Sequence, residues 1–218
     1  MSRKTTVKAT CPGCKEEFEI TMWDSVNVDI NPEEKARILD GSFFDQKCEH
    51  CGKVTKMFYP ILYHDMSNKL MMWFMGKDSS TDEIYQTIEF AENQLDNFEE
   101  GGKYAYRMVS VPSELVEKAL IFDKGLDDRV IEVVKLIVTV MTADNYPDEN
   151  IEKIYFAVDK NNGEYMLVLY AESGNIIATN LEMTFYEAIA NEYADAIERA
   201  SEKKYIIDQR WAMGIFKE

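Results

Sequence analysis

Four cysteines in two C-x-x-C pairs constrain this chain more than any other feature. The pairs read C-P-G-C at residues 11–14 and C-E-H-C at residues 48–51, and no cysteine is left over. Two intervening residues let both sulfurs of one tight turn reach the same ion, and two such turns complete a tetrahedral thiolate site with bonds of about 2.3 Å. The sequence therefore predicts one structural Zn²⁺ ion, bound by Cys11, Cys14, Cys48 and Cys51.

The segment between the two pairs is 33 residues long, whereas a generic zinc ribbon has roughly 15 to 20 residues there. A short helix explains the excess. Asn31 is a suitable cap, Pro32 fits the first helical turn, and Gly41 stands just past the expected end. We predict a helix over Asn31–Asp40, inserted into a β-structure that surrounds the cysteines.

The same cysteines allow a redox interpretation, because C-P-x-C also occurs in dithiol oxidoreductases, where a helix N-terminus lowers the pKa of the first cysteine. Here the residues from Lys15 to Ile20 alternate like a strand, and two matched pairs exceed the needs of one redox dithiol. We favour zinc. A thiol-disulfide or metal-sensing protein is the alternative, and it predicts easy zinc loss and oxidation at low peroxide.

Charge and hydropathy limit the location and the partners. The N-terminus is polar and has no signal-peptide core, so we expect a cytoplasmic protein. The most apolar helical stretch, residues 130–141, is too short for a membrane span, which needs roughly 20 residues. Of the formal charge of -16, residues 1–76 hold 10 Lys/Arg against 11 Asp/Glu, and residues 77–218 hold 14 against 29. Nucleic-acid binding is therefore disfavoured, and the N-terminal lobe is its only candidate region.

Hydrophobic periodicity and turn signals predict an α+β fold in two domains. Residues 1–145 form the first, with a zinc-ribbon-based β lobe over 1–76 and a helical part over 77–145 that includes helices at 112–122 and 127–143. A polar loop over residues 145–150, containing Pro147, is the expected boundary. Residues 146–218 form the second domain, a small antiparallel β-meander with a helix.

The second domain reads as three strands, at residues 154–159, 164–171 and 175–181, joined by Gly-containing turns. Thr184 and Glu187 form a capping box that begins a helix reaching about Ala200. A tail containing Trp211 and Phe216 ends the sequence.

Aromatic and methionine side chains gather in two neighbouring segments, residues 57–63 and 70–75. Such residues are enriched at adaptable binding surfaces, yet a run with few polar alternates is also typical of a strand covered on both faces. A possible interaction surface thus consists of Tyr59, Tyr63, Met72, Trp73 and Phe74, with a buried hairpin as the alternative.

The two histidines do not indicate an enzyme. His50 lies between two predicted ligands, and because the sulfur site is already complete we interpret it as an exposed spacer. His64 has no Ser or Cys nucleophile in a recognised motif. No catalytic residue is predicted.

Two motifs resemble the CpXC family of bacterial proteins. One is the Cys-Pro-x-Cys start with its Cys-x-x-Cys-Gly partner and the hydrophobic β-segment that follows; the other is V-P-S-E-L-V-E-K at residues 111–118 with G-L-D-D-R at 125–129. The resemblance spans about residues 7–140. It implies an uncharacterised zinc-ribbon-like protein and supplies no activity or substrate. Lys15 stands where glycine often follows the second cysteine, which we expect to change the turn.

Together these features predict a zinc-stabilised protein-interaction or scaffold module with an unknown protein partner. The redox or metal-sensing alternative uses the two C-x-x-C pairs differently. Nucleic-acid binding through the N-terminal lobe is a weaker alternative, and it would show a steep loss of affinity with salt.

Overall fold

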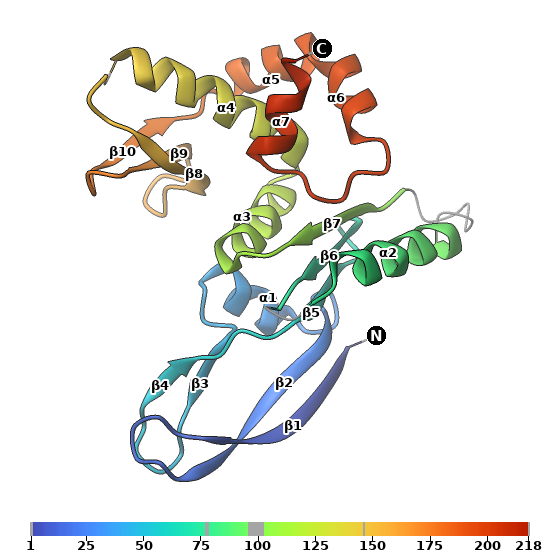
Figure 1. The fold of residues 1–218 in the computed structure, drawn as a ribbon, viewed down its shortest axis with the longest axis vertical. Coiled ribbons are helices and arrows are strands. Elements are labelled where there is room, and N and C mark those ends of the chain that lie inside the picture. Colours follow the sequence, from blue (N-terminus) through green and yellow to red (C-terminus); the bar gives the residue numbers. More distant parts are fainter. Residues whose placement is uncertain (1, 77–78, 96–102, 146, 218) are drawn as a thin grey trace. The chain divides into compact units, whose positions relative to one another are not determined.

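The structure is a computed structural model that describes residues 2–76, 79–95, 103–145 and 147–217. Helices and three β-sheets alternate along this part of the chain (Figure 1), which confirms the predicted α+β class. The chain divides into two compact units, Met1–Ala119 and Leu120–Glu218. Within the described residues, no helix has both the length and the apolar character that a membrane crossing requires.

Unit 1 is built on a five-stranded mixed sheet with the order β1-β2-β5-β6-β7. β1 pairs antiparallel with β2, and β5 with β6, whereas β2 runs parallel to β5 and β6 runs parallel to β7. Each parallel pair needs a crossover, so the chain between its two strands leaves the sheet and returns. The five strands are β1 (Arg3–Thr10), β2 (Glu17–Asn27), β5 (Ile61–Asp65), β6 (Leu70–Phe74) and β7 (Ala105–Val109).

The first crossover, between β2 and β5, carries helix α1 (Pro32–Leu39) and the hairpin of β3 (Asp45–Lys47) and β4 (Val54–Lys56). Helix α1 confirms the predicted insertion, with Asn31 at the N-cap, proline in the first turn and Gly41 at φ +80° after the end. A partly buried ion pair, Lys35 Nζ to Asp65 Oδ2 at 3.0 Å, links α1 to β5.

The second crossover, between β6 and β7, carries helix α2 (Thr81–Leu95). Helix α3 (Pro112–Asp123) follows β7, and the division between the two units falls within it. Helix α3 lies close to the position predicted for it, residues 112–122.

The hairpin of β5 and β6 is covered, which corrects the proposed interaction surface. Tyr63 and Met72 have no exposed area, Phe74 is 3% exposed, Tyr59 is 5% exposed, and Trp73 alone is partly exposed. The Tyr59 hydroxyl accepts a hydrogen bond from the Trp23 backbone N–H, so even its polar end is satisfied inside. Central strands of a covered sheet are apolar on both faces, and the sequence pattern reflects that position.

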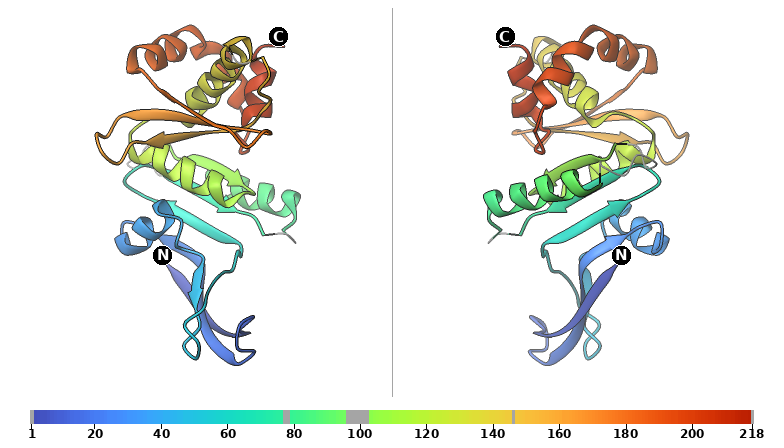
Figure 2. Two further views of the ribbon diagram at one scale, coloured as in Figure 1. Left: turned by 90° about the vertical axis from the view of Figure 1, so that its left-hand side faces the viewer. Right: turned by 90° about the vertical axis from the view of Figure 1, so that its right-hand side faces the viewer.

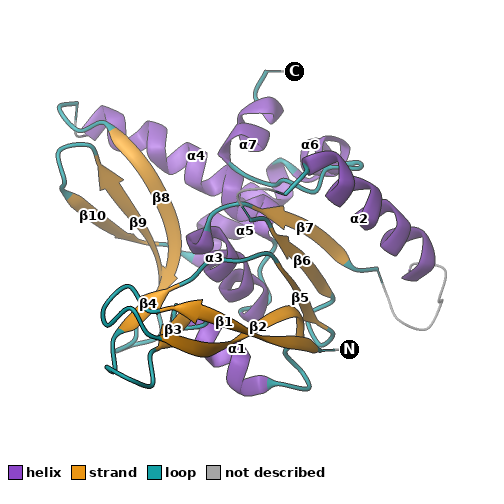
Figure 3. Ribbon diagram, turned by 60° about the horizontal axis from the view of Figure 1, so that its bottom comes forward, coloured by secondary structure: helices purple, strands orange, loops and turns teal. Residues whose placement is uncertain are grey.

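Unit 2 places a three-stranded antiparallel meander, of order β10-β9-β8, against helix α4 (Figure 3). This confirms the predicted meander. Its core unites α4, the sheet and the last three helices, and includes Ile131, Val134, Leu167 and Leu169. The elements of this unit are α4 (Asp128–Asn145), β8 (Ile151–Val158), β9 (Tyr165–Ala171), β10 (Ile176–Asn180), α5 (Met183–Glu192), α6 (Ala194–Ser201) and α7 (Gln209–Ile215).

The C-terminal segment differs from its prediction in two ways. The expected single helix is broken at Tyr193, which ends α5 and begins α6, and this bend accompanies the burial of both Ile189 and Ile197 in the same core. Where the sequence predicted a tail, the structure has helix α7. Its N-cap residue, Asp208, accepts a hydrogen bond from the Trp211 N–H at 2.8 Å.

The boundary between the two compact units lies in helix α3, between Ala119 and Leu120, and not in the loop over residues 145–150 where the sequence predicted it. That loop joins α4 to β8, and both elements bury apolar side chains in one core. Its polar composition marks a surface turn inside unit 2. Helix α4, grouped by the sequence with residues 77–145, packs with the C-terminal strands and helices.

Candidate metal centre

The two C-x-x-C turns lie at the ends of two neighbouring hairpins in unit 1. The first turn joins β1 to β2, and the second joins β3 to β4; Figure 2 shows both hairpins side by side in each of its views. Two side-chain hydrogen bonds hold them together, since the Gln46 amide donates to the Thr21 carbonyl at 3.4 Å and His50 Nε2 lies 2.9 Å from the Glu17 carbonyl oxygen. The hairpins thus deliver sulfurs from sequence-distant segments to one place.

The first turn is closed by its own backbone. The Cys11 N–H donates to the Glu16 carbonyl at 2.9 Å, and the Lys15 N–H donates back to the Cys11 carbonyl at 3.0 Å. Lys15 has φ +68°, in the left-handed region that disfavours side chains with a Cβ.

The second turn repeats this pattern. The Cys48 N–H donates to the Lys53 carbonyl and the Gly52 N–H donates to the Cys48 carbonyl, each at 2.9 Å. Gly52 has φ +73°, close to the value at Lys15. The expectation that Lys15 changes the turn is wrong, because the lysine adopts the backbone conformation that glycine favours.

The four sulfurs surround one point. All lie within 4.8 Å of one another. Two of the separations link the hairpins, Cys11 Sγ to Cys51 Sγ at 3.6 Å and Cys14 Sγ to Cys48 Sγ at 3.8 Å. A regular tetrahedron with metal–sulfur bonds of about 2.3 Å has edges of about 3.8 Å. The predicted cysteines are therefore assembled with room for one metal ion between them.

A small apolar cluster supports the sulfurs. Cys11 and Cys48 are each 1% exposed and pack with Phe18 and Ile20, with Ala9, Met22 and Met57 at the margin. Cys14 is partly buried, and Cys51 is exposed. The sulfur cluster is thus enclosed by protein except on the side of Cys51.

Gly13 lies close to the sulfurs. Its backbone N–H donates to Cys11 Sγ at 3.3 Å. A Cβ at this position would lie 3.5 Å from the sulfurs of Cys11 and Cys51, and 2.9 Å from Cδ of Lys53. A small side chain here would therefore make ordinary contact with the sulfurs and require a shift of the flexible lysine side chain.

Backbone hydrogen bonds, burial and the neighbouring thiols perturb the pKa values of Cys11 and Cys14. The backbone N–H of Cys14 is the largest influence that lowers the pKa of Cys11, to about 6. For Cys14, a backbone hydrogen bond involving Glu16 favours the thiolate, but burial and the three neighbouring sulfurs outweigh it and raise the pKa to about 12. Adjacent thiolates repel one another, and a bound divalent cation would remove that conflict by holding all four deprotonated.

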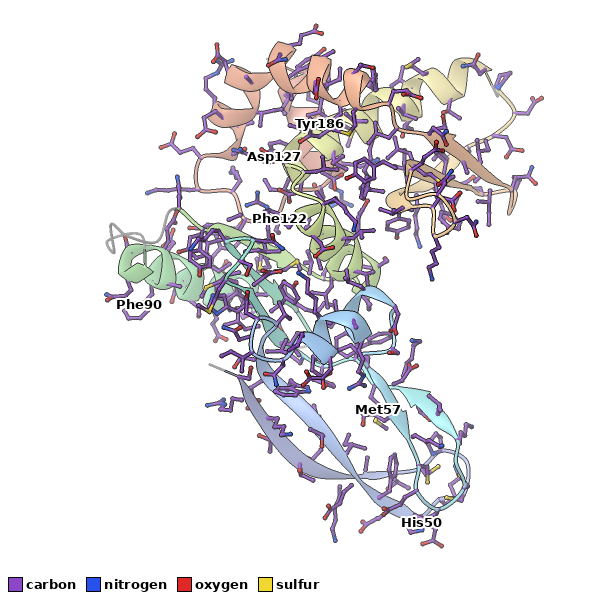
Figure 4. All side chains as sticks on the ribbon, turned by 180° about the vertical axis from the view of Figure 1, so that it is seen from behind. His50, Met57, Phe90, Phe122, Asp127 and Tyr186 are labelled. Atoms are coloured by element: carbon purple, nitrogen blue, oxygen red, sulfur yellow. The ribbon has the colours of Figure 1, made fainter. Side chains whose placement is uncertain are left out.

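His50 lies outside the sulfur cluster, as predicted. Its side chain is 45% exposed, and Figure 4 shows it at the end of the two hairpins. Sequence reasoning did not foresee its contact with the Glu17 carbonyl. This contact positions the second turn against β2 and so helps to set where Cys48 and Cys51 meet the first pair.

Comparison with known proteins gives one match. The model of the family described as CpXC protein matches residues 9–135. No curated protein and no solved structure was found to match the chain. The family match takes in all four cysteines and extends over more than half of the sequence, so the chain belongs to the CpXC family.

Proposed function

We propose that this protein is a zinc-stabilised interaction or scaffold module without catalytic activity, acting in the bacterial cytoplasm. The observation that carries the proposal is the arrangement of the four sulfurs, which lie within 4.8 Å of one another, with separations of 3.6 and 3.8 Å between the two hairpins. Four protein ligands fill a tetrahedral site and leave no open position where water or substrate would be activated. The metal then contributes stability, and the surface of the folded unit provides the function.

The donor set favours zinc among the common metals. Thiolates are soft ligands, and a tetrahedral tetrathiolate is typical of zinc or of iron–sulfur chemistry, whereas magnesium and calcium prefer oxygen. All four cysteines are free thiols in the structure, in keeping with a reducing compartment. In zinc-finger peptides such binding is worth on the order of 10 kcal/mol at neutral pH.

Elemental analysis of protein purified without added metal tests the proposal, paired with thiol titration under native and denaturing conditions. We expect about one zinc per chain, with thiols that become reactive only after denaturation. Iron in place of zinc would reject the assignment of the ion. Substoichiometric metal with freely reactive thiols would reject the closed structural site.

A second candidate, a metal- or redox-sensing role, is supported by the exposure of Cys51. An oxidant reaching this sulfur finds Cys11 at 3.6 Å, so a disulfide across the hairpins would remove two ligands at once. Zinc release during titration with hydrogen peroxide separates the candidates. Release at one equivalent of peroxide, reversed by dithiothreitol, favours sensing, whereas retention through a large excess favours the structural role.

A further inference from the structure

The meander of unit 2 ends in an open edge at β10. The sheet order is β10-β9-β8, so β10 is paired with another strand on one side only. Ile176, Ala178, Thr179 and Asn180 are exposed, and Ile177 is partly buried against the core of the unit. Figure 3 shows β10 at the margin of its sheet. The strand therefore presents backbone groups to solvent along its free side.

The register with β9 determines which backbone groups of β10 point outward. Along an antiparallel ladder, residue pairs that exchange two hydrogen bonds alternate with pairs that exchange none. The Ala171 N–H donates to the Asn175 carbonyl at 2.9 Å, and the Leu181 N–H donates to the Tyr165 carbonyl at 2.8 Å. The register is unbroken between these two pairs. The odd-numbered residues of β10 therefore bond to β9, and the even-numbered residues turn their N–H and C=O groups to the open edge.

The outward groups of β10 form a self-complementary set. They belong to Ile176, Ala178 and Asn180, with Ala178 at the centre of the strand. A second copy of the strand can run antiparallel to the first with the two Ala178 residues facing each other. Ile176 of each copy then faces Asn180 of the other, and each facing pair exchanges both of its hydrogen bonds about a two-fold axis.

Charge favours a second copy of the chain at this edge. Residues 173–181 carry no charge, although residues 120–218 hold 10 Lys/Arg against 19 Asp/Glu. Like charges that face each other across a ladder are destabilising. Glu164 accepts a hydrogen bond from the Asn180 side chain at 3.4 Å, so in the two-fold arrangement the two Glu164 carboxylates lie at opposite ends of the joint. Two acidic copies can therefore meet along β10 without bringing carboxylates face to face.

Other edge strands in the described part of the chain have features that discourage such pairing. Natural sheets protect their edges with charged side chains, β-bulges, short strands or a cover of other elements. β8 contains Glu152 and Lys153, and its register shifts between Ile151 and Lys153. β1 carries three basic residues, β7 is buried over most of its length, and β3 and β4 have three residues each. β10 has no charge, no proline and no register shift.

We propose that two copies of this chain associate through β10, which pairs antiparallel with itself about Ala178 and joins the two meanders into one continuous sheet. The contact is made by backbone groups, and the side chains beside it are uncharged. The inference goes beyond the proposed function. It does not depend on the metal centre, which belongs to unit 1.

Sedimentation velocity of the full-length chain, purified without chelator, tests the association. We expect reversible dimers with a dissociation constant on the order of 10 µM, typical of a small transient interface. Added salt should strengthen the dimers, because it screens the repulsion between two chains that each carry a net charge of -16.

Amide hydrogen exchange followed by NMR tests which side of β10 is used. The N–H groups of Ile177 and Thr179 should be protected at every protein concentration, because they bond to β9. Those of Ile176, Ala178 and Asn180 should gain protection only as the dimer forms.

Charged residues at the two-fold axis test the register. In Ala178→Lys and in Ala178→Glu, identical charges face each other, so each variant alone should dimerise about fivefold more weakly than the unsubstituted chain. An equimolar mixture of the two variants should recover the loss, because opposite charges then meet across the joint. Recovery in the mixture requires that residue 178 faces itself, and a foreign partner strand would not produce it.

Proline at the same position tests the role of the backbone. Because Ala178 turns its N–H away from β9, Ala178→Pro removes a donor from the joint without removing a bond within the sheet of one copy. It should abolish the dimers and leave the circular dichroism spectrum of the monomer unchanged. Ala178→Val is the matched control, since it keeps the N–H and favours extended backbone, and it should retain the dimers.

Several outcomes would overturn the proposal. They are a chain that stays monomeric far above the expected dissociation constant, dimers that persist in Ala178→Pro, and a mixture of Ala178→Lys with Ala178→Glu that dimerises no better than either alone. Elemental analysis tests the proposed function separately. Stoichiometric zinc in a monomeric chain rejects the pairing through β10 alone, and dimers without zinc reject the closed metal site alone.

Discussion

The cysteine end of unit 1 and the core of unit 2 are built on different physical principles. In unit 2, one continuous apolar cluster joins α4, the meander and the three last helices. At the cysteine end, the buried cluster consists of Cys11, Phe18, Ile20 and Cys48, so half of it is ligand. Each buried large apolar side chain contributes about 1.5–3 kcal/mol, which is enough for unit 2 and too little for the paired hairpins.

This difference indicates where a bound metal would contribute most to the fold. β1 is almost wholly exposed along its length, and β3 and β4 have three residues each. Ordering such segments costs roughly 1–2 kcal/mol per residue, and the local apolar contacts do not offset that cost. We therefore expect metal binding to decide the state of the hairpin ends, while unit 2 folds without it.

The largest predicted effect is metal removal. Chelation, or Cys48→Ser, should unfold the ends of β1–β2 and β3–β4 at a cost on the order of 10 kcal/mol, and leave β9 and α4 protected. Hydrogen exchange with mass spectrometry checks this region by region. Loss of hydrogen-exchange protection in both units together would contradict the proposed difference between them. Full protection of the hairpin ends without metal would contradict it as well.

A core truncation in unit 2 should destabilise unit 2 and leave the cysteine end of unit 1 unaffected. Leu169 is fully buried in β9, so Leu169→Ala should cost about 2–5 kcal/mol through lost contacts and a cavity. Thermal unfolding should shift down while the metal content stays unchanged. Ile176→Ala in the neighbouring strand is the control, since Ile176 is 62% exposed and its truncation should be nearly neutral. Equal effects of the two would contradict the assigned core.

The two turns offer a smaller, paired test. Gly52 has positive φ and open space around it, so Gly52→Ala should destabilise the metal-loaded hairpins by about 1 kcal/mol through backbone strain alone. Lys15→Gly should stabilise them by about 0.5 kcal/mol, as relief of the left-handed strain exceeds the added chain entropy. Denaturant titration at saturating zinc measures both. The same sign for both variants would refute the equivalence of the turns.

The smallest effect is on pH dependence. Burial opposes the charge of Asp29, but hydrogen bonds from the Ser67 hydroxyl and from the Met66 and Ser67 N–H groups lower its pKa below the usual value. A lowered carboxyl pKa gives stability that is present above the unfolded-state pKa, about 3.9, and is lost as pH falls through the folded-state value. Asp29→Asn should therefore reduce the loss of unit 1 stability that occurs as pH falls.

Unit 2 has a counterpart to this acid-sensitive contact. Hydrogen bonds from Ser173 and then Asn175 lower the pKa of the exposed Glu149, so the sign is the same. Glu149→Gln should reduce the loss of unit 2 stability as pH falls, and it should leave the pH dependence of unit 1 stability unchanged. Acid titration followed by residue-resolved NMR distinguishes the two, and a crossed effect would show that the units do not titrate independently.

Local signals predicted the cysteine cluster well, and tertiary packing limited the rest. Two residues between cysteines are typical of a tight turn, so the meeting of all four cysteines was predictable from their spacing. Proline at the start and glycine past the end located α1 in the same way. These features depend on neighbours along the chain, and distant contacts do not change them.

The sequence of the β5–β6 hairpin could not predict that Tyr63 and Met72 are buried. An apolar strand has the same sequence pattern whether the rest of the protein or a binding partner covers it. The break at Tyr193 and the position of α4 in unit 2 follow from which apolar faces meet in the core. No single stretch of sequence contains that information.

The position of the second cysteine pair within the β2-to-β5 crossover also determines the order in which the ligands are made. Cys14 leaves the ribosome 34 residues before Cys48, an interval of about 2–7 s at 5–20 residues per second. Throughout that interval the nascent chain exposes an isolated dithiol with half a binding site. The yield of correctly folded protein in a growing cell should therefore depend on the protection of these thiols at the ribosome, before the finished chain could bind a metal.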